Sequence, residues 1–203
     1  MKKDLNSIEN YIDSLLNSKS YLNFSLPPKN VNIREHFRIS QKFKKIVLVA
    51  LGGSGERLGD HLSGYKQSNK KNCKSKYFSN ELNWAKFLIK NSKKFPDTFF
   101  IFRPHPRDYS SRNHSVEASI IKEYYKLSNQ NLTNCAFNFK NDKISLYDFV
   151  PYVDLLLNSS SVTSYEFGLF GIRTLVFDPK LYYYADDLVI YPKKFNYYLP
   201  QLR

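Results

Sequence analysis

The chain has only two cysteines, Cys73 and Cys135, in 203 residues. Two cysteines cannot build the disulfide framework of a small secreted domain, and their spacing fits no common metal site, so we expect a reducing cytoplasm as the location. Long apolar runs are also missing, since no stretch approaches the roughly 20 residues that span a bilayer. The amino-terminal segment MKKDLNSIENYIDSLL has no apolar signal-peptide core. We therefore expect a cytoplasmic protein whose membrane contact, where it occurs, is peripheral and on the inner face.

Acidic residues are few. The chain has 18 Asp and Glu against 31 Lys and Arg, which gives a formal net charge of +13. Such a charge attracts polyanions, anionic lipid surfaces and charged small molecules. The lysines fall in short surface runs and form no long arginine-rich arm, so nucleic acid is not the expected partner. Large apolar residues are not lacking, because 42% of the chain is hydrophobic and 16% aromatic, enough for one substantial core.

Apolar, β-branched runs alternate with helical patterns along the chain. The expected strands are 46–51, 98–102, 135–139, 154–157 and 174–177, with 188–191 as a candidate last strand. The expected helices are 5–16, one from Ser79 or Asn80 to Lys90, 116–127, one that starts at a capping box at 145–148, and 162–170. This alternation predicts an α/β domain with a Rossmann-like parallel sheet, covered by helices on both faces. We place this domain at 45–203, after a lead-in at 1–44 that contains a helix and an irregular stretch.

The segment at 154–178, DLLLNSSSVTSYEFGLFGIRTLVFD, has the pattern of a strand, a serine turn, a helix and a second strand. A turn of this kind offers backbone N–H groups and hydroxyls at a helix amino terminus, where the helix dipole favours an anion. The candidate phosphate ligands in this turn are Ser159, Ser160, Ser161 and Thr163. The alternative is an ordinary helix cap. Glu166 follows one turn later, where a carboxylate can accept two hydrogen bonds from ribose hydroxyls.

A second anion-friendly loop, Arg103-Pro104-His105-Pro106-Arg107, follows the strand at 98–102. Prolines on both sides restrict the backbone around His105, so its ring loses little entropy when it binds a ligand. Arg103 and Arg107 offer forked donors to a diphosphate. The alternative is a turn with exposed arginines and a histidine satisfied by the backbone. Parallel sheets bind ligands beyond the carboxyl ends of their strands, and both loops occupy such positions.

Together these motifs resemble a known family. The pattern Thr163-x-x-Glu166-x-x-x-x-Gly171 before an apolar strand is similar to the carboxyl-terminal, donor-binding half of GT-B glycosyltransferases. The His-Pro pair at 105–106 resembles that of bacterial enzymes of surface and capsule polysaccharide assembly, including CDP-glycerol glycerophosphotransferases and certain sialyltransferases. The resemblance implies that His105 and the serines contact donor phosphate and that Glu166 holds the ribose. The chain departs from the family pattern where Gly-x-Pro is usual, because Arg173 stands at the proline position.

The resemblance implies a transferase that moves a sugar or a phospho-polyol from a nucleotide-activated donor to a glycan or a lipid-linked glycan acceptor. It implies no cofactor and no metal. Catalysis would rest on electrostatic stabilisation of the departing phosphate by His105, the serine turn and Arg103 or Arg107. The chain has room for a single GT-B-type half, so we expect a second domain or chain to complete the cleft. No residue of the sequence identifies the general base.

A glycine-rich loop, GGSGERLG at 52–59, follows the first strand. Its glycines permit close approach of a ligand to the backbone, but the loop is neither a Walker A nor a GxGxxG motif. In the glycosyltransferase interpretation the residues that line the cleft are Gly52, Gly53, Ser54 and Gly55. The loop also resembles that of sugar nucleotidyltransferases, which gives one alternative function. The other alternative is a non-catalytic module that binds nucleotides or polyanions.

Overall fold

The computed structural model describes residues 2–17, 27–53, 78, 80–109, 118–159 and 161–176, with side chains in the first helix from residue 6 onward. The helices are α1 (Lys2–Leu16), α2 (Ile33–His36), α4 (Glu81–Ser92), α5 (Ser119–Ser128) and α6 (Thr163–Leu169). The strands are β1 (Lys45–Ala50), β2 (Thr98–Arg103), β3 (Cys135–Phe137), β4 (Leu155–Asn158) and β5 (Arg173–Val176). Three 3-10 turns are η2 (Pro106–Asp108), η3 (Lys140–Asp142) and η4 (Tyr147–Phe149). The candidate last strand at 188–191 lies outside the described residues.

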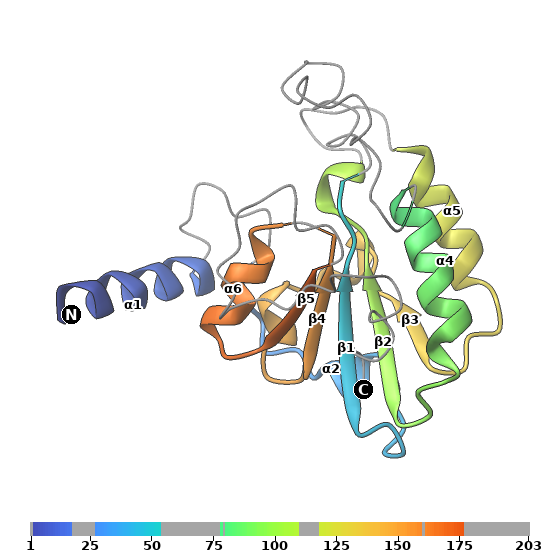
Figure 1. The fold of residues 1–203 in the computed structure, drawn as a ribbon, viewed down its shortest axis with the longest axis horizontal. Coiled ribbons are helices and arrows are strands. Elements are labelled where there is room, and N and C mark those ends of the chain that lie inside the picture. Colours follow the sequence, from blue (N-terminus) through green and yellow to red (C-terminus); the bar gives the residue numbers. More distant parts are fainter. Residues whose placement is uncertain are drawn as a thin grey trace.

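The strands form one parallel sheet of five, in the order β3-β2-β1-β4-β5 (Figure 1). The chain moves outward from β1 through β2 to β3, then crosses back to place β4 on the other side of β1. The connections that follow β1 and β4 therefore leave toward opposite faces of the sheet. Between their carboxyl ends lies the topological switch point, where open parallel sheets bind their ligands. The predicted Rossmann-like α/β fold is confirmed.

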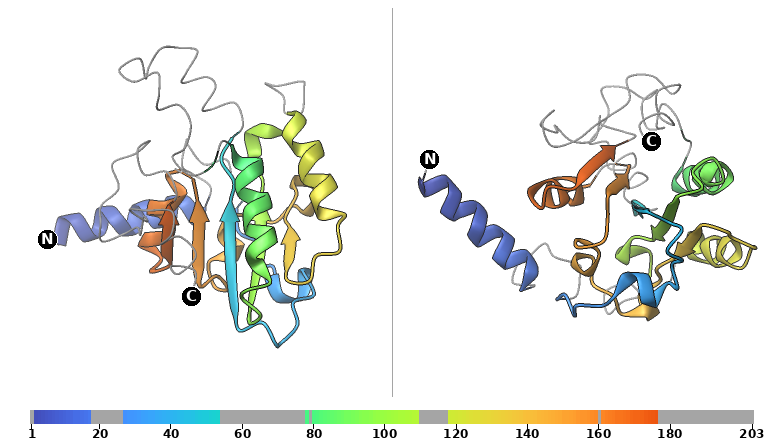
Figure 2. Two further views of the ribbon diagram at one scale, coloured as in Figure 1. Left: turned by 45° about the vertical axis from the view of Figure 1, so that its right-hand side comes forward. Right: turned by 90° about the horizontal axis from the view of Figure 1, so that it is seen from below.

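Both faces of the sheet are buried, and β1 shows how the sequence achieves this. Val47 and Val49 pack into a core with α4 and α5, whereas Ile46 and Leu48 pack into a second core on the opposite face. Successive side chains of a strand point to opposite faces, so a continuous apolar run fills both cores. The second core also contains Ile33 of α2, Phe149 of η4 and Phe167 of α6. Figure 2 shows α4 and α5 lying together on one side of the sheet, away from α2 and α6.

Part of the lead-in belongs to this second core. Ile33, Ile39 and Phe43 are buried there beside the strands. A buried carboxylate, Asp148, fixes the start of this segment, because its Oδ1 accepts the N–H groups of Lys29 at 2.7 Å and Val31 at 3.4 Å. The described residues from 27 to 44 therefore pack as part of the α/β unit. The domain boundary at 45 stays a prediction.

The helix predicted to start at the capping box at 145–148 is wrong in length, since only the single 3-10 turn η4 forms there. Half of the box is present, because Asp148 Oδ2 accepts the Ser145 N–H at 2.9 Å. The Ser145 hydroxyl instead accepts the N–H of Tyr147, at 3.2 Å. The sequence predicted that Pro151 ends this helix, and η4 does end before Pro151, although Val150 itself keeps αR geometry. Asp148 therefore anchors the lead-in rather than a helix.

We expect Asp148→Ala to lower the free energy of unfolding by about 3 kcal/mol, because it leaves buried N–H groups without their charged acceptor. Asp148→Asn keeps one acceptor oxygen and should fall between Asp148→Ala and wild type. Urea unfolding followed by circular dichroism measures the loss. The control is Glu123→Gln, which removes a carboxylate from an exposed pair with Lys126 and should change stability little. Equal stability of Asp148→Ala and the control would contradict the anchoring role.

Candidate functional site

Three of the predicted loops begin side by side at one edge of the sheet. Ala50, the last residue of β1, is in register with Arg103 of β2 and with Asn158 of β4. The loops that start at 51, 104 and 159 therefore leave from one row, as the sequence analysis expected for a ligand site at the carboxyl ends of the strands. Of the predicted site residues, Ser54, Gly55 and Ser160 lie outside the described residues. The others are placed as follows.

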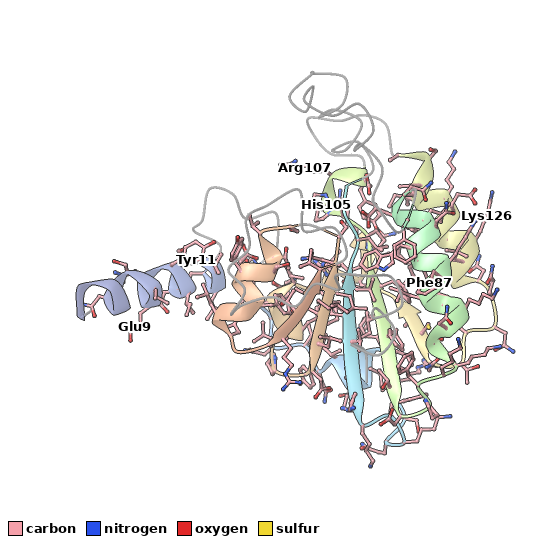
Figure 3. The ribbon with its side chains drawn as sticks, viewed as in Figure 1. Glu9, Tyr11, Phe87, His105, Arg107 and Lys126 are labelled. Carbon is pink, nitrogen blue, oxygen red and sulfur yellow. The ribbon has the colours of Figure 1, made fainter. Side chains whose placement is uncertain are left out.

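His105 lies beyond the end of β2 and caps the 3-10 turn η2. Its Nδ1 accepts the backbone N–H of Arg107 at 3.2 Å. With Nδ1 as an acceptor, the neutral imidazole carries its proton on Nε2, so this nitrogen is a donor. Figure 3 shows His105 and Arg107 together at the end of the molecule where β1 and β2 finish, and Arg107 is exposed. The short turn thus fixes the tautomer and presents a cation beside it.

Arg103 is held by the fold. Its Nη1 donates to Asn138 Oδ1 and to the Ile144 carbonyl oxygen, the latter at 3.2 Å. Its guanidinium also lies 5.8 Å from the centre of the Phe149 ring. Burial lowers the pKa of Arg103 to about 10, while Tyr109, Asp142 and Asp148 act in the opposite direction, so the group stays charged at neutral pH. Arg103 links β2 to the crossover after β3, and its phosphate contact stays a prediction.

The serine turn satisfies much of its own backbone. The hydroxyl of Ser161 accepts the Thr163 N–H at 3.3 Å and donates to Thr163 Oγ1 at 3.1 Å. The Ser164 N–H donates to the Ser161 carbonyl oxygen at 3.1 Å. The N–H groups of Thr163 and Ser164 thus have hydrogen-bond partners within the turn. This is the arrangement expected of an ordinary helix cap, the alternative to phosphate binding. Ser159 is buried, with 3% of its surface exposed. Phosphate binding by this turn stays a prediction.

Asn158 is a polar residue at the switch point that the sequence analysis did not assign to the site. Its Nδ2 donates to the Ser164 hydroxyl at 2.6 Å and so ties the end of β4 to α6. Its Oδ1 is buried and has no hydrogen-bond partner among the described residues. An unmet buried acceptor costs about 1–3 kcal/mol, so this atom indicates a place where a donor can be accommodated. The signal in the sequence was an amide at the last position of an otherwise apolar strand.

Glu166 lies on α6 in a mainly buried position beside two tyrosines. The hydroxyl of Tyr147 donates to Glu166 Oε2 at 3.2 Å. Burial raises the pKa of Glu166 above its ordinary value, while the hydrogen bond from Tyr147 acts to lower it. Burial, and then the charge of Glu166, raise the pKa of Tyr147 and of Tyr11 on α1. The amino-terminal helix therefore brings the exposed Tyr11 near the predicted ribose ligand, which the sequence analysis did not foresee.

Glu81 is the second residue that the sequence analysis missed. It is the first residue of α4, which begins there because Asn80 Oδ1 accepts the Asn83 N–H at 2.8 Å. Its side chain is buried, and its Oε2 accepts the Gly52 N–H at 3.1 Å. A signal existed, because Glu81 shares a helix face with the buried residues Trp84 and Leu88. A carboxylate at a core position indicates a specific partner.

No protein-family model and no curated protein sequence matches this chain. In the part of the chain that the structure describes, no group of three or more His, Cys, Asp or Glu side chains is arranged to hold a metal ion. Within the same residues, every helix is too short or too polar to cross a bilayer. The functional argument therefore rests on the motifs and their geometry.

We expect the free energy of unfolding to fall as pH rises from about 4.5, the ordinary pKa of glutamate, through the higher pKa of folded Glu166. The folded state holds this proton more tightly than the unfolded state, so ionisation favours unfolding. Glu166→Gln should lack this part of the decline. Urea unfolding of both proteins between pH 4 and 7 measures the difference.

Tyr147→Phe is the matched variant, because it removes the hydrogen bond that lowers the pKa of Glu166. In this variant the fall in the free energy of unfolding should extend to higher pH than in wild type. Stability curves of wild type and Glu166→Gln that run parallel across this range would show that Glu166 has no raised pKa in the folded protein.

Proposed function

We propose that this chain is the donor-binding domain of a glycosyltransferase that acts in surface polysaccharide biosynthesis. It binds a nucleotide-activated donor and supports transfer of a sugar or a phospho-polyol to a glycan or lipid-linked glycan. The observation that carries the proposal is the position of the His-Pro loop and the serine turn. Their strands, β2 and β4, flank β1, and both loops start at the carboxyl edge beside the switch point. In Rossmann-like sheets this edge binds nucleotides.

Different residues at this edge contact different parts of the proposed donor. The Nε2–H group of His105 and the guanidinium of Arg107 face the diphosphate or monophosphate of the donor. A carboxylate on α6, Glu166, accepts hydrogen bonds from the ribose, with Tyr147 holding one of its oxygens at 3.2 Å. The net charge of +13 raises the local concentration of anionic donors at the protein surface. Together these contacts orient the donor for attack by an acceptor bound opposite.

Catalysis in this proposal is electrostatic. Charge develops on the departing nucleotide phosphate, and fixed donors that meet this charge lower the barrier. His105 is suited to this task because the turn already fixes its ring and tautomer, so little reorganisation accompanies the reaction. A second domain or chain supplies the acceptor site and the general base. The protein would act in the cytoplasm, with peripheral contact at the inner face of the membrane where a lipid-linked acceptor is used.

Heat-stability shifts with UDP-, CMP- and CDP-linked donors test this function. We expect at least one donor to raise the melting temperature of wild type, because ligands that bind only the folded state stabilise it. His105→Ala should weaken the binding free energy of that donor by about 1–3 kcal/mol, the scale of a lost charged hydrogen bond. The control is His36→Ala, since His36 is an exposed histidine on α2, at the opposite end of the sheet (Figure 1).

Failure of every donor to stabilise the wild-type protein would contradict the proposed function. Wild-type affinity in both His105→Ala and Glu166→Ala would contradict the assignment of the site while leaving nucleotide binding intact. Donor binding without transfer to any acceptor, even with a complementing domain added, would instead favour the non-catalytic binding module.

A further inference from the structure

Glu81 holds the loop after β1 at Gly52, where this loop packs against Ser159 at the start of the loop after β4. Its Oε2 accepts the N–H of Gly52, in the loop after β1, at 3.1 Å. A Cβ atom built on Gly52 would lie 2.8 Å from Ser159 Oγ and 3.1 Å from Glu81 Oε1. Gly52 is therefore enclosed by a carboxylate from α4 on one side and by a hydroxyl from the loop after β4 on the other. Three segments far apart in sequence meet at this point.

The contact is buried. Glu81 is 4% exposed and Ser159 is 3% exposed. Glu81 stands in the first turn of α4, where the helix dipole stabilises a negative charge. The Asn80 side chain caps the same turn and so fixes the backbone from which the Glu81 side chain extends. A charge placed in this way at low exposure holds its partners in one arrangement.

The carboxylate is poorly placed to contact the donor itself. Its negative charge repels the donor phosphates, and its burial keeps ligand atoms away. The group that Glu81 holds is the backbone N–H of Gly52, which packs against Ser159 at the start of the loop after β4. The effect of Glu81 on binding must therefore act through these neighbours.

We propose that Glu81 is a positioning residue of the donor site, which fixes the loop after β1 against the loop after β4. This inference rests on the proposed function, because it concerns the same site. Gly52 is required at this contact, since any Cβ would displace Ser159. The placement of Gly52 against Ser159 depends on one hydrogen bond from a backbone N–H to a buried carboxylate.

The variants Glu81→Ala and Glu81→Gln test the inference in the full chain, with the donor that stabilises wild type most. Glu81→Ala should weaken donor affinity about tenfold, because Gly52 loses its acceptor. Glu81→Gln should restore most of that affinity, since its amide oxygen can accept the same N–H. The control is Glu123→Ala, which removes an exposed glutamate from α5 and should leave affinity unchanged. Isothermal titration measures each affinity on protein shown to be folded.

The amide resonance of Gly52 reports the contact directly. It should shift upfield in Glu81→Gln relative to wild type, because a neutral acceptor replaces a charged one. A second measurement is independent of nucleotide binding. Gly52→Ala should lower the melting temperature, and Gly52→Ala combined with Ser159→Ala should recover part of the loss, because the 2.8 Å clash involves Ser159 Oγ.

Wild-type affinity in Glu81→Ala would overturn the inference and leave the proposed function standing. Equal weakening in Glu81→Ala and Glu81→Gln would overturn it as well, since the hydrogen bond would then not be the cause. A wild-type protein that binds no donor would overturn the proposed function, and the role of Glu81 in donor binding with it. If Glu81→Ala does not fold, two measurements decide the question. They are the donor affinity of Glu81→Gln and the melting temperatures of Gly52→Ala with and without Ser159→Ala.

Discussion

Burial of β1 on both faces is the constraint on which the rest of the structure depends. Its alternating side chains fill two cores at once, and its backbone pairs in parallel with β2 on one side and β4 on the other. The register of a strand fixed in this way also sets where its carboxyl end lies. The loops that follow β1, β2 and β4 take their places from this register, so the proposed site is a product of core packing.

The strands were predictable because continuous β-branched and aromatic runs have few other uses in a domain of this size. Their order in space was not predictable, since β1 pairs with β4 across more than a hundred positions of sequence. The same limit applies to buried polar groups. Local patterns mark Asn80 as a cap and His105 as a rigid turn, but the partners of Glu81 and Glu166 arise from the tertiary fold. At 145–148 the predicted capping box formed only in part, because Asp148 also accepts N–H groups from residues 29 and 31, more than a hundred positions away.

The predicted site residues differ in how far the protein itself holds them. Arg103 and the first turn of α6 have partners within the protein, which a list of cations and hydroxyls along the sequence cannot reveal. The side chains of Arg107 and, in part, His105 face solvent at the same edge. Fixed groups behind and accessible groups in front are what a preorganised site requires, because the supporting bonds limit the motion of the residues that meet the ligand.

The hydrogen bond from Lys29 to Asp148 spans 119 positions of the chain. During synthesis, residues 29–31 leave the ribosome long before their acceptor exists, and at about 5–20 residues per second the interval is roughly 6–24 s. Throughout that time Ile33 and Phe43 lack the wall of the core that β4 and η4 provide. The apolar residues of the nascent amino-terminal segment therefore stay without their native partners until residue 148 has been synthesised.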